Sequence, residues 1–171
     1  MGKGLRDRVQ GKGIYVAIFI IIILFIWYFV ANSNLYERPI KNYFDGLSRA
    51  DSKIMFKALP DFARKELLKE KSYREYDKSL KTIIDDMKEE YGDNFKIKYK
   101  IIAKESIDNT DLESVANEFK KTYNTSVDIT EGYKLKVDIT TKGSKKEETN
   151  SLDFFVYKIN NVWSLKELQN H

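Results

Sequence analysis

The feature that most constrains this 171-residue chain is an unbroken apolar run from Ile14 to Ala31. As an α-helix, its 18 residues rise about 27 Å, close to the thickness of a bilayer's hydrocarbon core. Trp27 and Tyr28 stand near its end, where aromatic rings favour the membrane interface. The run therefore predicts a single-pass transmembrane helix over residues 14–31, anchored by Ile14, Trp27, Tyr28 and Ala31.

Basic residues before the run predict its orientation. Residues 1–13 contain two lysines and two arginines against Asp7, so this leader is expected in the cytoplasm and the rest of the chain outside the cell membrane. The alternative is a cleaved signal peptide, because Ala31 and Ser33 are small, but the apolar run is longer than such peptides need. A linker (residues 32–38) and one extracytoplasmic domain (residues 39–168) are expected to follow.

Composition excludes several kinds of site. The leader contributes +3 of the formal charge of +4, so the domain is nearly balanced and nucleic acid is not expected as a partner. The chain has no cysteine, and its one histidine is His171, so thiol and His-based chemistry have no candidates. We predict no catalytic residue, no metal and no cofactor, and thus not an enzyme. The abundance of Ile, Lys, Asn and Tyr points to a bacterial source.

Helical spacing predicts several helices in the first half of the domain. Pro39 suits a first helical turn, and apolar residues follow at i, i+3, i+4 and i+7, namely Ile40, Tyr43, Phe44 and Leu47. Asp51 is placed to cap a short second helix, and a third helical piece follows it. The strongest helix is expected between the capping box of Ser72 and Glu75 and a terminating Gly92.

A period of two predicts strands from Asn94 onward. Lysines alternate there with apolar residues, as on a strand with one face in water. Thr110 and Glu113 form a second capping box and predict a helix that interrupts the sheet. The polar segment Gly143–Asn150 is the expected turn between later strands. Those later strands are expected at Val127–Thr140, Leu152–Ile159 and Val162–Leu165.

This order of elements predicts an α+β fold in which helices pack on a curved, mainly antiparallel sheet. The opening helix Pro39–Leu47 with Asp51 after it, and the closing hairpin Tyr157–Leu165, resemble the nuclear-transport-factor-2-like (cystatin-like cone) superfamily. The resemblance covers about Arg38 to Leu168 and implies a cone-shaped domain with an interior pocket. The stub, span and cone together are also similar to inner-membrane assembly factors of type IV secretion and conjugation systems.

The resemblance implies one set of candidate residues. Enzymes of the superfamily use carboxylates, histidine and tyrosine inside the cone, so Asp45, Tyr43, Tyr99 and Tyr157 are weak pocket candidates here. Tyrosines in such positions also serve as ordinary core residues with their hydroxyls at the rim.

A second set of candidates forms a possible interaction surface: Phe154, Phe155, Lys96, Lys98, Lys134 and Lys136. The strand around the two phenylalanines has no polar face, so it is either covered on both sides or part of a partner surface. The lysines either meet anionic lipid or wall polymer, or form the hydrated side of the sheet.

The leading functional hypothesis is a membrane-anchored, non-catalytic interaction or assembly module of a bacterial envelope or secretion/conjugation complex. Its expected partners are the membrane, other proteins or a second copy of the chain. The alternative is a ketosteroid-isomerase-like pocket protein of the envelope that binds a small apolar ligand.

Overall fold

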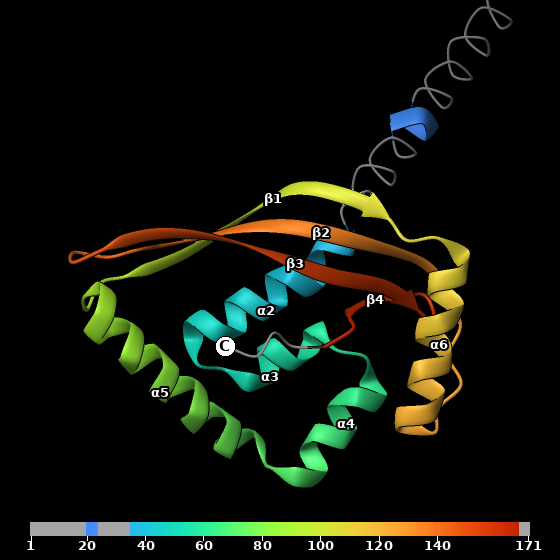
Figure 1. Cartoon of the computed structure of the whole chain (residues 1–171), viewed down its shortest axis with the longest axis horizontal. Helices are drawn as coiled ribbons and strands as arrows, with labels where there is room; N and C mark the ends of the chain where they lie inside the picture. Colours follow the sequence, from blue (N-terminus) through green and yellow to red (C-terminus); the bar gives the residue numbers. More distant parts are fainter. Residues whose placement is uncertain (1–19, 24–34, 168–171) are drawn as a thin grey trace, which may run out of the picture. The chain divides into compact units, whose positions relative to one another are not determined.

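The computed structural model describes residues 20–23 and 35–167 (Figure 1). The chain divides into two units, Met1–Leu35 and Tyr36–His171. In the first unit, residues 20–23 are helical and exposed. The second unit contains the sheet and the helices that surround it.

The predicted transmembrane helix is contradicted. Within residues 20–23 and 35–167, no helix is both long enough and apolar enough to cross a bilayer. The described part of the apolar run is four helical residues, which rise only about 6 Å. The predicted anchor residues Ile14, Trp27, Tyr28 and Ala31 lie outside the described residues. The single-pass topology and the membrane localisation, which rested on that helix, are withdrawn with it.

Two of the three helix N-caps that the sequence predicts are found in the second unit. Asp51 accepts a hydrogen bond from the Ile54 N–H at 3.0 Å, and Ser72 and Glu75 form the predicted capping box. Gly92 ends the longest of the described helices with a φ of 102°, a conformation that favours glycine. The elements are η1 (Leu35–Glu37), α2 (Arg38–Arg49), α3 (Ser52–Met55), η2 (Phe56–Ala58), α4 (Asp61–Glu70), α5 (Tyr73–Tyr91) and α6 (Asn109–Tyr123).

The cap of α6 differs from the prediction. Asp108, not Thr110, is the N-cap residue, and its carboxylate accepts a hydrogen bond from the Asp111 N–H at 2.9 Å. Asp108 has an extended backbone, which sets its side chain over the first turn of the helix. Aspartate also caps at least as well as threonine, so the helix begins two residues earlier than the Thr110 pattern indicates.

Four antiparallel strands form the sheet, and each pairs with the next along the chain: β1 (Lys96–Ser106), β2 (Ile129–Lys142), β3 (Glu147–Ile159) and β4 (Val162–Leu165). A register shift between Ile101 and Ala103 interrupts the ladder of β1 with β2. Asn160 and Asn161, with φ of 48° and 66°, make the tight turn into β4. The predicted α+β fold with an antiparallel sheet is confirmed.

The hairpin of β2 and β3 extends further than predicted. Residues 147–150, expected in the turn because they are polar, pair instead with residues 139–142. The hydroxyls of Thr140 and Thr149 lie 2.9 Å apart, and Lys142 forms an ion pair with Glu147. Cross-strand pairs of this kind stabilise a ladder whose side chains remain in water.

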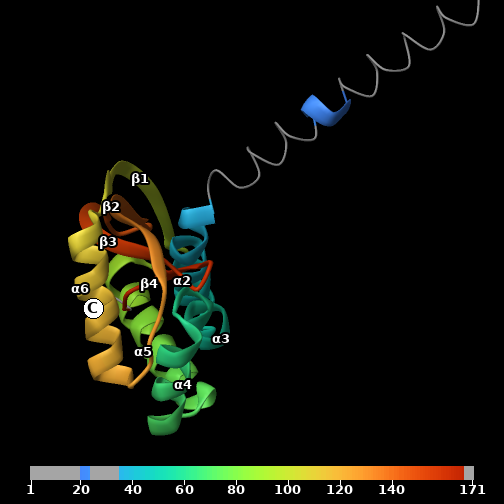
Figure 2. The same ribbon diagram turned by 90° about the vertical axis from the view of Figure 1, so that its right-hand side faces the viewer.

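The two faces of the sheet are covered differently. On the core face, α2 packs against buried residues of β2 and β3, among them Leu135 and Phe154, which are fully buried. On the opposite face, α6 covers one end of the sheet, where Phe119 packs with Tyr157 and Ile159. Figure 2 shows α2 and α3 on one side of the strands and α6 on the other.

Part of the predicted linker belongs to the folded unit. The ring of Tyr36 meets Tyr133 and Trp163 edge-on, at centroid distances of 5.3 and 6.2 Å. The Lys104 ammonium lies 4.5 Å from the centre of the Tyr36 ring. These contacts order the chain three residues before Pro39, while residues 32–34 lie outside the described part.

Candidate functional site

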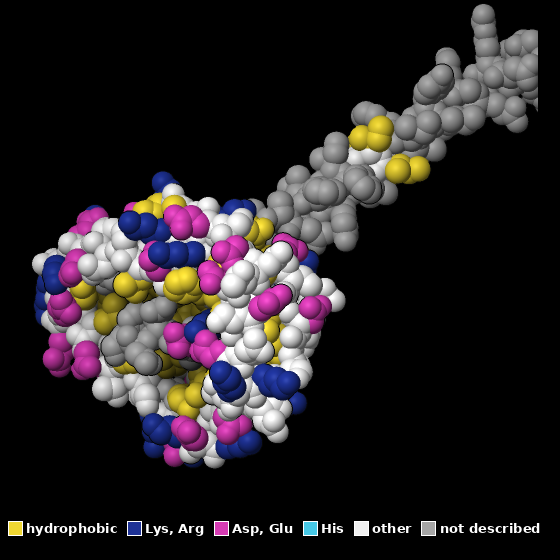
Figure 3. Space-filling model, turned by 45° about the vertical axis from the view of Figure 1, so that its right-hand side comes forward, with side chains coloured by type: hydrophobic (Ala, Val, Ile, Leu, Met, Phe, Trp, Pro, Cys, Tyr) yellow, Lys and Arg dark blue, Asp and Glu magenta, His cyan; other side chains and the backbone are white. Residues whose placement is uncertain are grey.

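The helices of the second unit form the walls of an apolar groove of about 430 Å³. Residues of α2, α3, η2, α4 and α5 line it, together with Tyr123 at the end of α6 and two residues that follow β4. Its apolar lining comprises Leu47, Met55, Phe56, Leu59, Ala63, Leu67, Leu80 and Ile83. Figure 3 shows hydrophobic side chains gathered on one face of this unit.

Helical spacing places these side chains on the faces of α2 and α5 that line the groove. Tyr76, Leu80 and Ile83 lie at i, i+4 and i+7 on α5, so they share one face of that helix. Tyr43 and Leu47 lie at i and i+4 on α2 and form the facing wall. The groove therefore arises where two amphipathic helices face each other without closing the space between them.

A buried polar contact ties α3 to α5 behind this lining. Asp77 of α5 accepts hydrogen bonds from the Ser52 N–H at 2.8 Å and from the Ser52 hydroxyl at 2.6 Å. Ser52 is fully buried, so its N–H depends on that carboxylate, while its hydroxyl also lies 3.1 Å from the Tyr73 carbonyl. The contact sets the distance between the α3 and α5 walls.

Two hydroxyls that line the groove already donate hydrogen bonds to backbone carbonyls. The Tyr76 hydroxyl donates to the Leu67 carbonyl at 3.2 Å, and the Ser79 hydroxyl donates to the Glu75 carbonyl at 3.3 Å. Burial raises the pKa of Tyr43 far above its ordinary value, which keeps its hydroxyl protonated. The body of the groove therefore presents mainly carbon atoms to a ligand.

One end of the groove is polar. Tyr123, Lys166 and Glu167 meet there, and Lys166 forms an ion pair with Glu118 of α6 at 2.8 Å. Burial raises the pKa of Tyr123, and the charge of Glu167 raises it further, so this tyrosine is a hydrogen-bond donor at neutral pH. The groove therefore has an apolar body and a polar end that offers both donor and acceptor groups.

The structure does not bring the four predicted pocket candidates together. Tyr43 lines the groove, but Tyr99 lies on β1 and stacks on Phe44, with ring centroids 4.8 Å apart. The Asp45 side chain is partly exposed on α2 and forms an ion pair with Lys41. Burial raises the pKa of Tyr99, and the negative charge of Asp45 raises it further. Tyr157 lies on the opposite face of the sheet, where burial raises its pKa to about 12.

The predicted interaction residues divide between the faces of the sheet. Phe154 is fully buried on the core face, whereas Phe155 is 39% exposed on the other. We call this second face, which carries the lysines of β1 and β2, the lysine face. Lys134 lies opposite Phe155 across the ladder, and Lys136 lies opposite Asp153. Lys96 and Lys98 lie nearer the β2–β3 hairpin on the same face, opposite Lys142 and Thr140.

Sequence reasoning missed most of the groove. The stripe on α5 was visible as an apolar face, but that pattern predicts core packing and not an open space. The pairing of Ser52 with Asp77 links residues 25 positions apart and has no local signal in the sequence. Within the described residues, no group of three or more acidic or histidine side chains is placed to hold a metal ion.

No protein-family model, curated protein or solved structure matches this chain. The resemblance to the nuclear-transport-factor-2-like superfamily therefore stays a prediction. The site has to be interpreted from its own geometry.

Proposed function

We propose that the folded unit is a non-catalytic binding module that takes a small, largely apolar ligand in the helix-lined groove. The observation that carries this proposal is a space of about 430 Å³ with eight apolar side chains along its body and polar groups at one end. Ligand sites typically measure about 300–1,000 Å³ and combine an apolar lining with a few polar groups that fix orientation. The groove falls in the lower part of that range, which suits a small ligand.

The polar end sets the expected chemistry of the ligand. Tyr123 and Lys166 donate hydrogen bonds and Glu167 accepts them, so a ligand with one polar end and an apolar body matches both parts of the groove. Tyrosines whose pKa is raised by burial keep their protons at neutral pH and orient a ligand without acting as bases. These properties favour binding over conversion of the ligand.

The first test blocks the groove from an exposed position. Ser79 lines the groove, yet its side chain lies on the exposed part of α5, so Ser79→Phe fills space without disturbing the core. Thr82→Phe is the matched control, because Thr82 is exposed on the same helix, is outside the groove, and also donates its hydroxyl to a carbonyl four residues earlier. The probe is 8-anilinonaphthalene-1-sulfonate, an apolar fluorophore with one anionic group, titrated into the full chain.

We expect the unaltered chain and Thr82→Phe to bind the probe equally, and Ser79→Phe to bind it at least about 10-fold more weakly, a loss of about 1.4 kcal/mol. Chemical-shift changes should map to the methyl groups of Leu47, Leu80 and Ile83. Equal binding by both phenylalanine variants, or shifts confined to other residues, would refute the proposal.

A further inference from the structure

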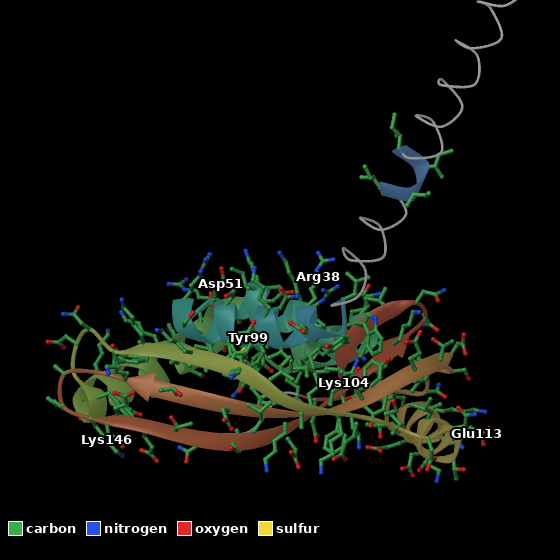
Figure 4. All side chains as sticks on the ribbon, turned by 90° about the horizontal axis from the view of Figure 1, so that it is seen from above. Arg38, Asp51, Tyr99, Lys104, Glu113 and Lys146 are labelled. Atoms are coloured by element: carbon green, nitrogen blue, oxygen red, sulfur yellow. The ribbon has the colours of Figure 1, made fainter. Side chains whose placement is uncertain are left out.

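Among residues 35–167, β1 lies at one edge of the sheet and pairs with β2 alone. This strand is 11 residues long, about twice the usual length, and it is the first strand in the order β1-β2-β3-β4. Figure 1 shows it along the margin of the second unit, and Figure 4 shows Tyr99 and Lys104 along its length between Lys146 at the hairpin and Glu113 on α6. In an antiparallel strand, alternate residues direct their N–H and C=O groups away from the paired neighbour, so this edge presents a row of backbone donors and acceptors.

The two faces of this edge differ in character. Ile97, Tyr99 and Ile101 are half-buried against the core, so an added strand would find apolar neighbours on that side. Lys96, Lys98 and Lys100 are exposed on the lysine face, and their spacing along the strand is about 6.8 Å. Within residues 35–167, Lys96 and Lys98 make no ion pair.

A hollow of about 490 Å³ adjoins these lysines at the hairpin end. Its lining includes Lys96, Lys98 and Lys142, with Glu147 as the one carboxylate among the described lining residues. Glu147 is already paired with Lys142. Lys100, by contrast, lies opposite Asp138 of β2. The first half of β1 therefore combines outward backbone groups, two lysines without an ion pair in the described residues, and a hollow over its ladder with β2.

We propose that β1 is a docking edge for an extended, acidic segment of a partner protein. The segment adds to the sheet as a fifth strand; its backbone pairs with β1, and its alternate acidic side chains face Lys96, Lys98 and Lys100. Main-chain pairing supplies affinity in this mode of recognition, and alternate side chains supply specificity. Opposite charges across a ladder add about 0.2–1 kcal/mol for each pair.

Charge selects this occupant over a second copy of the chain. Antiparallel pairing of two β1 strands through their first halves, in a register centred on Lys98, brings lysines opposite lysines, because Glu105 on the same face belongs to the second half of the strand. Like charges placed directly opposite are destabilising, which is why lysine protects sheet edges from self-pairing. An acidic strand reverses the sign of the same contacts. The proposal does not depend on the groove, which belongs to the helices.

The test uses synthetic peptides and the full chain. The probe is an eight-residue peptide of alternating threonine and glutamate, and its control replaces each glutamate by lysine. Two further versions of the acidic peptide carry backbone N-methyl groups on alternate residues. One version, or frame, is methylated at every threonine and the other at every glutamate. Lys98→Glu alters the docking edge, while Lys120→Glu, exposed on α6, is the matched control for charge. Binding is followed by calorimetry, and the site is mapped by amide hydrogen exchange.

We expect the acidic peptide to bind and the basic peptide not to bind. Lys98→Glu should weaken binding about 2- to 30-fold, since it removes one favourable pair and adds an unfavourable one of similar size. Lys120→Glu should have no effect. One N-methyl frame should abolish binding and the other should retain it, and amides of residues 96–106 should gain protection. Lys98→Glu should leave binding of the fluorophore in the groove unchanged.

Three results would overturn the proposal. Equal binding by both N-methyl frames would mean that charge alone holds the peptide, without strand pairing. Binding to phosphatidylglycerol vesicles through Lys98, with no peptide binding, would make the lysine face a lipid surface. Protection of residues 96–106 in the free chain that rises with its concentration would identify a second copy as the occupant.

Discussion

Gly46→Ala should lower the free energy of unfolding, although helix propensity alone predicts that alanine raises it. Gly46 lies inside α2, where alanine is favoured over glycine by about 1 kcal/mol. A Cβ atom at this position, however, would lie 2.5 Å from Met55 Cβ and 2.6 Å from Met55 Cα. Carbon atoms in contact normally lie about 3.5–4.0 Å apart. The methyl group therefore requires α2 and α3 to separate by about 1 Å, because a backbone atom cannot rotate out of its way.

The expected net loss of stability is about 2 kcal/mol. Overpacking of a dense interior costs about 1–3 kcal/mol, and a clash with backbone belongs at the upper end of that range. The gain in helix propensity offsets about 1 kcal/mol of it. For a folded unit of this size, each kcal/mol lowers the melting temperature by about 3–5 °C, so we expect a decrease of about 6–10 °C.

Urea and thermal denaturation, followed by circular dichroism, measure this difference. Ser48→Ala is the control, because Ser48 is exposed on the same helix and its replacement should be neutral or slightly stabilising. Met55 lines the groove, so Gly46→Ala should also weaken binding of the fluorophore. A Gly46→Ala chain as stable as the unaltered one, or more stable, would show that α2 and α3 do not approach as closely as the structure places them.

Two other predictions concern polar contacts. Asp77→Ala should lower the free energy of unfolding by about 1–3 kcal/mol, because the buried Ser52 N–H loses its acceptor and the Ser52 hydroxyl keeps only the Tyr73 carbonyl. Asp86→Ala, on the exposed side of α5, should change it by less than about 0.5 kcal/mol. Equal effects of the two substitutions in urea denaturation would exclude this role of Asp77. Hydrogen bonds from Lys146, and then from Asn150 and Tyr91, lower the pKa of Glu148 to about 2. Its contribution to stability is therefore complete above the unfolded-state pKa of about 4.3 and is lost as the pH falls toward 2. Urea midpoints measured from pH 5 to pH 2 should fall more steeply for the unaltered chain than for Glu148→Gln; parallel curves would contradict the prediction.

Local patterns predicted most of the secondary structure because the forces that form it are local. The capping box of Ser72 and Glu75, the Asp51 cap and the alternation of lysines on β1 each act within a few residues, and each is found in the structure. The exceptions also have local causes. Asp108 competes with Thr110 as a cap, and the polar residues 147–150 can form a strand because the ladder there lies in water.

The transmembrane prediction used the length and hydropathy of the run, its terminal aromatic residues and the basic leader. These properties describe how well a segment suits a bilayer as a helix. In the described residues no helix is both long enough and apolar enough to meet that requirement.

The candidate site could not be predicted to the same extent. The sequence identified Tyr43 and the apolar stripe of α5, but it grouped Tyr43 with Tyr99 and Tyr157. The structure separates these three residues among the groove, β1 and the far face of the sheet. Periodicity assigns a residue to one face of its own helix or strand, and it does not say which other element covers that face.

Local sequence patterns are sufficient for the class of the fold, for most helix starts and for the sidedness of β1, since these follow from backbone hydrogen bonding and from the period of apolar residues. The space between the helices, and the place of β1 at a sheet edge of the described unit, arise only when the elements pack together. Both depend on how elements far apart in the chain fit together. Contacts such as Ser52 with Asp77, or Gly46 against Met55, set that fit through distances that no local pattern encodes.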